Sequence, residues 1–161
     1  MPNNLQQKYS SQSRPGNQGD RSGGWIDRRW SEEKAMKEIK ESFGENFVEE
    51  ILGESKSDSN AYIEKIKKYV QNNRSGITTA QLRNVFSKVK NLDDCSELYT
   101  LRPKLAYVSG RAEKDEMKTL LFLLDELLVK VSEKKQHEQL KQFKNFFEAV
   151  IAYHKYFGGK E

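Results

Sequence analysis

The chain has 161 residues, of which 35% are hydrophobic and 32% charged, and its formal net charge is +4. This length suits one domain with an extension, and it is sufficient to bury a core without help from disulfides or metals. One cysteine and two histidines exclude a disulfide framework and provide too few ligands for a Cys/His zinc site.

The apolar residues form no run that is long enough to cross a membrane. The longest such run, at residues 120–124, contains five residues, whereas a membrane-spanning helix needs about 20. The first residues also lack the apolar stretch of a signal peptide. Because a single cysteine suits a reducing compartment, we expect a cytoplasmic protein with no membrane partner.

Residues 1–30 are predicted to form a disordered, basic N-terminal extension. Residues 1–24 are rich in Asn, Gln, Ser and Gly and have too few apolar side chains to offset the entropy lost on folding. The motif WIDRRW follows at residues 25–30. It has two interpretations: an anchor that holds the extension on the domain, or a patch that stacks on bases and contacts phosphates of single-stranded nucleic acid. The candidate contacts of that patch are Trp25, Arg28, Arg29 and Trp30.

Residues 31–161 are predicted to form a single domain, a compact all-α bundle of five to six helices with short connections. Apolar residues recur at helical spacing and no strand-like alternation interrupts them. A short apolar piece also follows Gly44. The predicted helices begin near Ser31, Asn60, Thr78, Thr100, Glu113 and His137. The fifth of them is apolar on most sides, which is typical of a buried central helix.

Several helix ends have recognisable signals. Ser31 is predicted to cap the first helix. Thr78 and Gln81 have the spacing of a capping box, in which the threonine hydroxyl accepts from the Gln81 amide. Thr100 is predicted to cap the next helix, and Gly110 is predicted to end it in the left-handed conformation.

The sequence offers few candidates for catalysis. Cys95 lies among acidic residues in DDCSE, which disfavours a thiolate. His154 lies on the apolar face of the last helix, where a packed, hydrogen-bonded histidine is the favoured interpretation. The sequence also has no glycine-rich loop that cradles phosphates. We therefore predict no catalytic residue, metal or cofactor, and an enzyme that uses His154 or Cys95 is the least favoured hypothesis.

Basic residues of two consecutive predicted helices are expected to line a groove between them. Residues 78–111 contain six basic and three acidic residues. A basic track contacts backbone phosphates and so gives affinity without base specificity. The alternative is a charged face that is only solvated. The predicted track comprises Arg83, Lys88, Lys90, Arg102, Lys104, Tyr107 and Arg111.

Three segments resemble the small subunit of the type III-A CRISPR effector complexes, the Csm complexes. They are ITTAQLRNVFSKV at 77–89, LRPKLAYVSGR at 101–111 and FFEAVIAYHKYFGGK at 146–160, in the order and spacing of that family. The resemblance covers residues 76–161. Because the chain before it is longer than the family pattern, the resemblance implies no role for WIDRRW or for the first helix.

The resemblance implies a small, all-helical, non-catalytic protein that serves antiviral defence. In such complexes more than one copy lines the inner filament along guide and target RNA, and other subunits perform the chemistry. The expected partners are therefore guide RNA, target RNA, other Csm subunits and further copies of this chain. The alternative is a helical adaptor or scaffold that binds proteins only. The resemblance implies RNA contacts for Arg83, Lys88, Arg102, Lys104 and Arg111, and position adds Lys90.

Overall fold

Helices account for every regular element of the computed structural model, which describes residues 29–159. The all-α prediction is therefore confirmed for this range. In chain order the helices are α1 (Glu32–Phe43), α2 (Phe47–Leu52), α3 (Ser59–Asn73), α4 (Thr79–Lys90), the 3₁₀ helix η1 (Cys95–Leu101), α5 (Arg102–Arg111), α6 (Asp115–Lys134) and α7 (His137–Tyr156).

The predicted number of five to six helices is too low for the described residues, which contain seven α-helices. The additional helix is α2. Gly44 ends α1 with a φ of +95°, a value that glycine adopts without strain. The apolar piece that follows then forms a separate helix of six residues.

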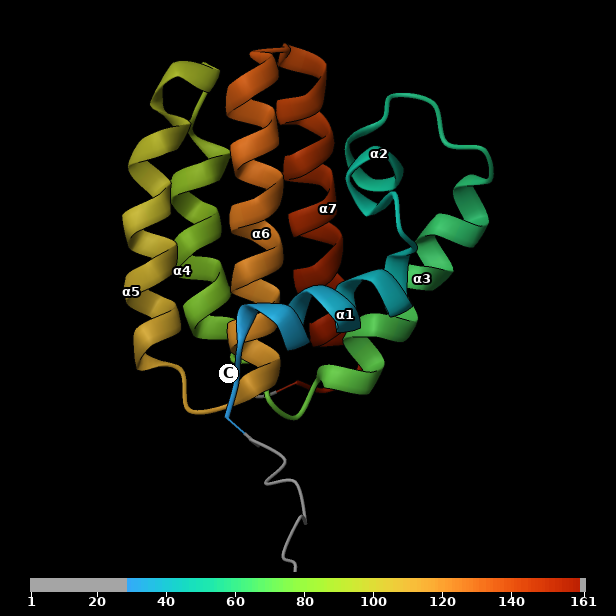
Figure 1. Cartoon of the computed structure of the whole chain (residues 1–161), viewed down its shortest axis with the longest axis vertical. Helices are drawn as coiled ribbons and strands as arrows, with labels where there is room; N and C mark the ends of the chain where they lie inside the picture. Colours follow the sequence, from blue (N-terminus) through green and yellow to red (C-terminus); the bar gives the residue numbers. More distant parts are fainter. Residues whose placement is uncertain (1–28, 160–161) are drawn as a thin grey trace, which may run out of the picture.

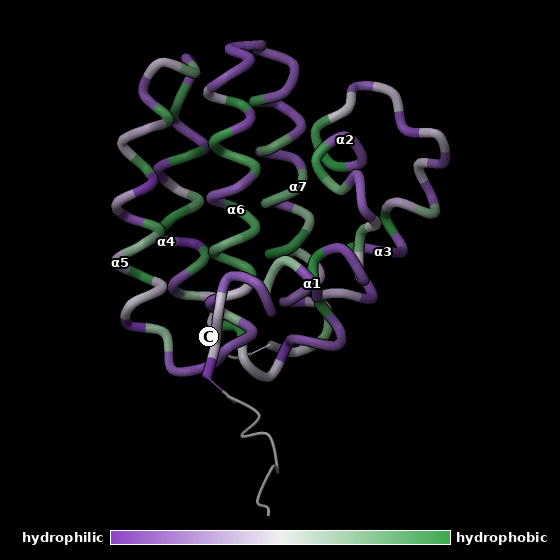
Figure 2. Tube along the Cα trace, viewed as in Figure 1, coloured by the Kyte–Doolittle hydropathy of each residue, from purple (hydrophilic) through white to green (hydrophobic). Residues whose placement is uncertain are grey.

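Four helices, α4 to α7, lie side by side and run alternately up and down (Figure 1). On the other side, α1 packs on α6, while α2 contacts α6 and α7, and α3 lies against α7. The buried apolar residues form one continuous cluster, and Figure 2 shows hydrophobic stretches along the inner sides of these helices. Nine side chains of α6 are buried, which confirms the prediction of a central helix. No helix within residues 29–159 has the length and apolar character to span a membrane.

The predicted helix ends are partly confirmed. Ser31 caps α1, since its hydroxyl accepts a hydrogen bond from the Lys34 amide at 3.3 Å. Thr100 does not cap α5; its hydroxyl donates to the carbonyl of Glu97 at 2.7 Å, inside η1. Because η1 leads directly into α5, that helix needs no separate side-chain cap. The prediction for Gly110 is also wrong: α5 continues to Arg111 and closes at Ala112, in extended conformation.

Lys56 holds the loop that follows α2. Its ammonium group donates to the carbonyls of Glu50, Ile51 and Gly53 at 2.6, 2.7 and 2.9 Å. It also lies 4.4 Å from the ring centroid of Tyr62. A cation at this position satisfies carbonyls that the end of a helix leaves without intrahelical partners. Lys56 is therefore a structural residue, although it lies in a polar loop.

Replacing Lys56 with alanine should lower the free energy of unfolding by about 1–2 kcal/mol, because three hydrogen bonds from a charged donor are lost. Thermal or urea unfolding of the full chain measures this. The matched control is Lys68→Ala on α3, where the side chain is exposed. Equal stability of the two variants would contradict a structural role for Lys56.

Candidate nucleic-acid interface

Three of the predicted contact residues share one flank of α5. Tyr107 and Arg111 follow Lys104 by three and seven residues, spacings that bring side chains to the same side of a helix. Tyr107 is 64% exposed. Nη1 of Arg111 donates to the Tyr107 hydroxyl at 3.0 Å, and the guanidinium lies 5.6 Å from the ring centroid. This flank presents two cations and an exposed aromatic ring.

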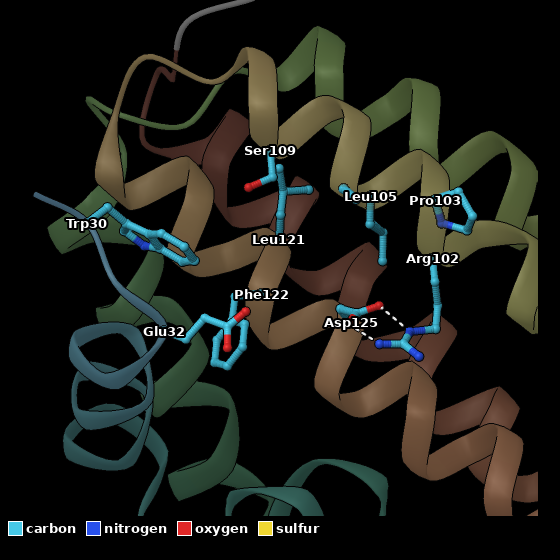
Figure 3. Close-up of a pocket in the computed structure, with 10 residues that line it drawn as sticks. Trp30, Glu32, Arg102, Pro103, Leu105, Ser109, Leu121, Phe122 and Asp125 are labelled. Atoms are coloured by element: carbon cyan, nitrogen blue, oxygen red, sulfur yellow. Dashed lines mark hydrogen bonds and ion pairs between the residues drawn. The ribbon is translucent and has the colours of Figure 1, made fainter.

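Arg102 lies on a different flank of α5 and is paired there. It precedes Lys104 by two residues, which corresponds to a rotation of about 200° around the helix. Its guanidinium binds Asp125 of α6 through two parallel bonds, Nε–Oδ1 at 2.8 Å and Nη2–Oδ2 at 3.0 Å (Figure 3). This hydrogen bonding raises the pKa of Arg102. The charge of Arg102 is therefore balanced within the chain.

The basic residues of α4 are divided between its two flanks. Gln81 lines a pocket together with Arg111 of α5, so that side of α4 faces α5, and Lys88 shares it because it follows Gln81 by seven residues. Lys90 lines a different pocket with Lys141 of α7. Arg83 precedes Lys90 by seven residues and belongs to that second side.

Lys88 lies opposite Lys104. The helices α4 and α5 contact each other and run in opposite directions (Figure 1). Gln81 and Arg111 lie at the same end of the helix pair. Seven residues forward along α4 to Lys88 and seven residues back along α5 to Lys104 therefore cover the same length in the same direction. Lys88 of α4 therefore shares one surface with the three α5 residues Lys104, Tyr107 and Arg111. We call this surface the α4/α5 strip, and all four of its side chains are exposed.

The start of α4 is held by a buried histidine of α7. His154 is fully buried, its Nδ1 lies 2.7 Å from the Thr79 hydroxyl, and its Nε2 lies 3.1 Å from the carbonyl of Arg74. Since a carbonyl only accepts, Nε2 is the donor of that bond. The close packing extends to Gly159, where a Cβ atom would clash with the imidazole. These contacts join the first and third family-like segments.

The predicted capping box at Thr78 is wrong in its hydrogen bonding. Thr78 has the extended backbone of an N-cap residue, but its side chain makes no cap hydrogen bond. The next residue, Thr79, is instead buried and bonded to His154. A tertiary contact therefore replaces the local one that the spacing predicted.

The WIDRRW motif is only partly within the described residues. Trp25 and Arg28 lie outside them, and the carbonyl of Arg29 accepts a hydrogen bond from Lys34 at 2.7 Å. Trp30 is half-buried, and its indole N–H donates to the Thr119 hydroxyl at 3.1 Å. Its ring also meets Phe122 edge-on at 6.2 Å. These contacts agree with the anchor interpretation for Trp30.

Two structural residues near the interface were missed by sequence reasoning. Asp125, the partner of Arg102, is 23 residues away along the chain, so no local pattern points to it. Lys144 of α7 donates to the carbonyls of Lys90 and Leu92 at the end of α4. Neither residue type is unusual on a helix surface, and only the tertiary structure identifies these roles.

His154 and Cys95, the two residues considered for catalysis, are both buried in the helical core. Both ring nitrogens of His154 are engaged inside the core. Cys95 is buried, and burial together with the nearby Asp94 raises the pKa of its thiol, which opposes thiolate formation. Within residues 29–159, acidic, histidine and cysteine side chains form no group of three or more that would suit a metal ion.

Comparison with protein-family models gives one family, Csm2 Type III-A, whose model matches residues 53–160. The match covers more than half of the chain and includes all of α3 to α7. It leaves out α1, α2 and the residues before them. Comparisons with curated proteins and with solved structures gave no match.

Replacing Thr79 with valine should lower the free energy of unfolding by about 1–3 kcal/mol, because a buried ring nitrogen of His154 loses its partner. Chemical unfolding of the full chain measures the change. The control is Thr78→Val, which removes the same hydroxyl one residue earlier and should have little effect. A larger loss for Thr78→Val than for Thr79→Val would show that the capping box, rather than the histidine, holds α4.

Proposed function

Because the chain belongs to the Csm2 Type III-A family and is thereby a small subunit of the type III-A Csm complex, we propose that it binds RNA directly and performs no catalysis. Its expected ligands are the guide RNA and the target RNA, beside other Csm subunits and further copies of itself. In this role it holds RNA for the antiviral chemistry of other subunits.

The observation that carries the proposal is the α4/α5 strip. Lys88, Lys104 and Arg111 place three exposed cations on adjacent helices, and cations in such a row bind successive backbone phosphates. Tyr107 lies among them with most of its ring exposed. An exposed ring adds base stacking, which is worth about 1–3 kcal/mol per base and tolerates any sequence. Contacts of these two kinds suit a subunit that must accept many different RNAs.

The predicted contacts outside the α4/α5 strip are less favourable candidates for binding the same stretch of RNA. Arg102 is a weak candidate because Asp125 already binds its guanidinium through two bonds. Arg83 and Lys90 belong to the side of α4 that faces α7, so they would meet a different part of an RNA strand. A non-catalytic role is supported by His154, whose ring nitrogens are both bonded in the core.

Replacing Lys88, Lys104 and Arg111 together with glutamine should weaken the binding of single-stranded RNA. Each lost phosphate contact lowers the slope of log affinity against log salt by about 0.7, so the slope should fall by about 2. Fluorescence anisotropy with a labelled RNA, titrated between low and moderate salt, measures both quantities.

Two controls separate this proposal from a general effect of charge. The triple variant Lys37→Gln, Lys67→Gln and Lys68→Gln removes the same charge from α1 and α3, outside the α4/α5 strip. Arg102→Gln tests the paired arginine and should change RNA affinity less than Lys104→Gln. An unchanged salt slope in the α4/α5 triple variant would refute the strip as the RNA site. A parent chain that retains no RNA at low salt would favour the protein-only adaptor.

A further inference from the structure

A pocket of about 420 Å³ lies between Trp30, α5 and α6, away from the α4/α5 strip. Figure 3 shows Trp30 on the segment that leads into α1, Leu105 on α5, and Leu121 and Phe122 on α6 around this space. Most of its surface is apolar. The pocket opens on the flank of α5 that carries Arg102, so the RNA contacts proposed above do not use it.

The edge of this pocket is acidic. Glu32 and Asp125 line it, and Glu126 follows directly on α6. Burial, and then the charges of Asp125 and Glu32, raise the pKa of Glu126, as expected for carboxylates close together. Arg102 balances only part of this charge, through its pair with Asp125. An apolar floor with an acidic edge suits a ligand that combines a large apolar side chain with a neighbouring cation.

The sequence directly before the pocket has this combination. The described residues begin at Arg29, next to the pocket residue Trp30. The motif continues backwards with Arg28, Asp27, Ile26 and Trp25, which lie outside the described residues. Trp25 and Ile26 are large apolar residues in an otherwise polar stretch. Five residues of extended chain span at most about 17 Å, so both side chains are within reach of the pocket.

We propose that this pocket is the binding site of the Trp25–Ile26 segment of the same chain, with Arg28 near the acidic edge. The linkage within one chain favours this ligand over a separate peptide, because a short connection gives a millimolar effective concentration. Its occupation would cover apolar surface of α5 and α6 that is otherwise open to water. The inference concerns a part of the chain that precedes the family match, and it does not depend on RNA binding.

Disulfide trapping in the full chain tests this site. Cysteine is introduced at Ile26 and at Ala106, an exposed pocket residue of α5. The control pair combines Ile26→Cys with Glu33→Cys, an exposed position on α1 that is close to Trp30 along the chain but does not line this pocket. A disulfide needs Cα atoms within about 7 Å of each other, so the Ile26–Ala106 pair should close at least about tenfold faster than the control pair. Peptide mapping by mass spectrometry identifies the linked cysteines and sets any reaction of Cys95 apart.

Each outcome decides the proposal. A dominant link between positions 26 and 106 within one chain supports it. Equal rates for the test and control pairs would overturn it. A link between positions 26 and 106 of two chains would also overturn it, in favour of a second copy as the ligand. If Ala106→Cys disturbs folding by circular dichroism, Ser109→Cys offers another position on the same pocket.

Discussion

The buried imidazole of His154 is the point on which the arrangement of the basic surface depends. It bonds to Thr79 at the start of α4 and to the carbonyl of Arg74 just beyond α3, and Gly159 packs against its ring. Two segments that are far apart in sequence, residues 74–79 and residues 154–159, are thereby held together. A polar network that is fully satisfied in a low-dielectric core orders its partners strongly. These contacts fix the orientation of α4 at its first residue, and that orientation determines which side chains of α4 face α5.

The basic residues of α4 and α5 therefore have different surroundings. The α4/α5 strip unites Lys88 with Lys104, Tyr107 and Arg111, while Lys90 faces α7. Arg102 belongs to a third environment, where Asp125 neutralises it. A count of positive charges along residues 78–111 treats all of these as equivalent. The structure instead favours the residues whose charge remains available at the surface, and the proposed RNA contact rests on these residues.

Much of the fold follows from local patterns, because a helix records its buried face in its apolar spacing. The central position of α6 and the Ser31 cap were predictable for this reason, and so was a packed role for His154. The pairings that define the site were not. Nothing near Thr78 indicates that Thr79 would turn to a histidine 75 residues away, and nothing near Arg102 indicates Asp125. Contacts between residues that are distant in sequence produce no periodic pattern in a single sequence. Which basic residues line the surface between α4 and α5 could therefore be determined only from the tertiary structure.

The proposed RNA path follows the outer flank of α5, beside α4. Photocrosslinking of the full chain to a single-stranded RNA that contains 4-thiouridine tests it most directly, with mass spectrometry of tryptic peptides as the readout. We expect the main crosslinked peptide to be residues 105–111, which contains Tyr107 and is released by cleavage after Lys104 and Arg111. Crosslinks confined to peptides of α1, α2 and α3 would contradict it.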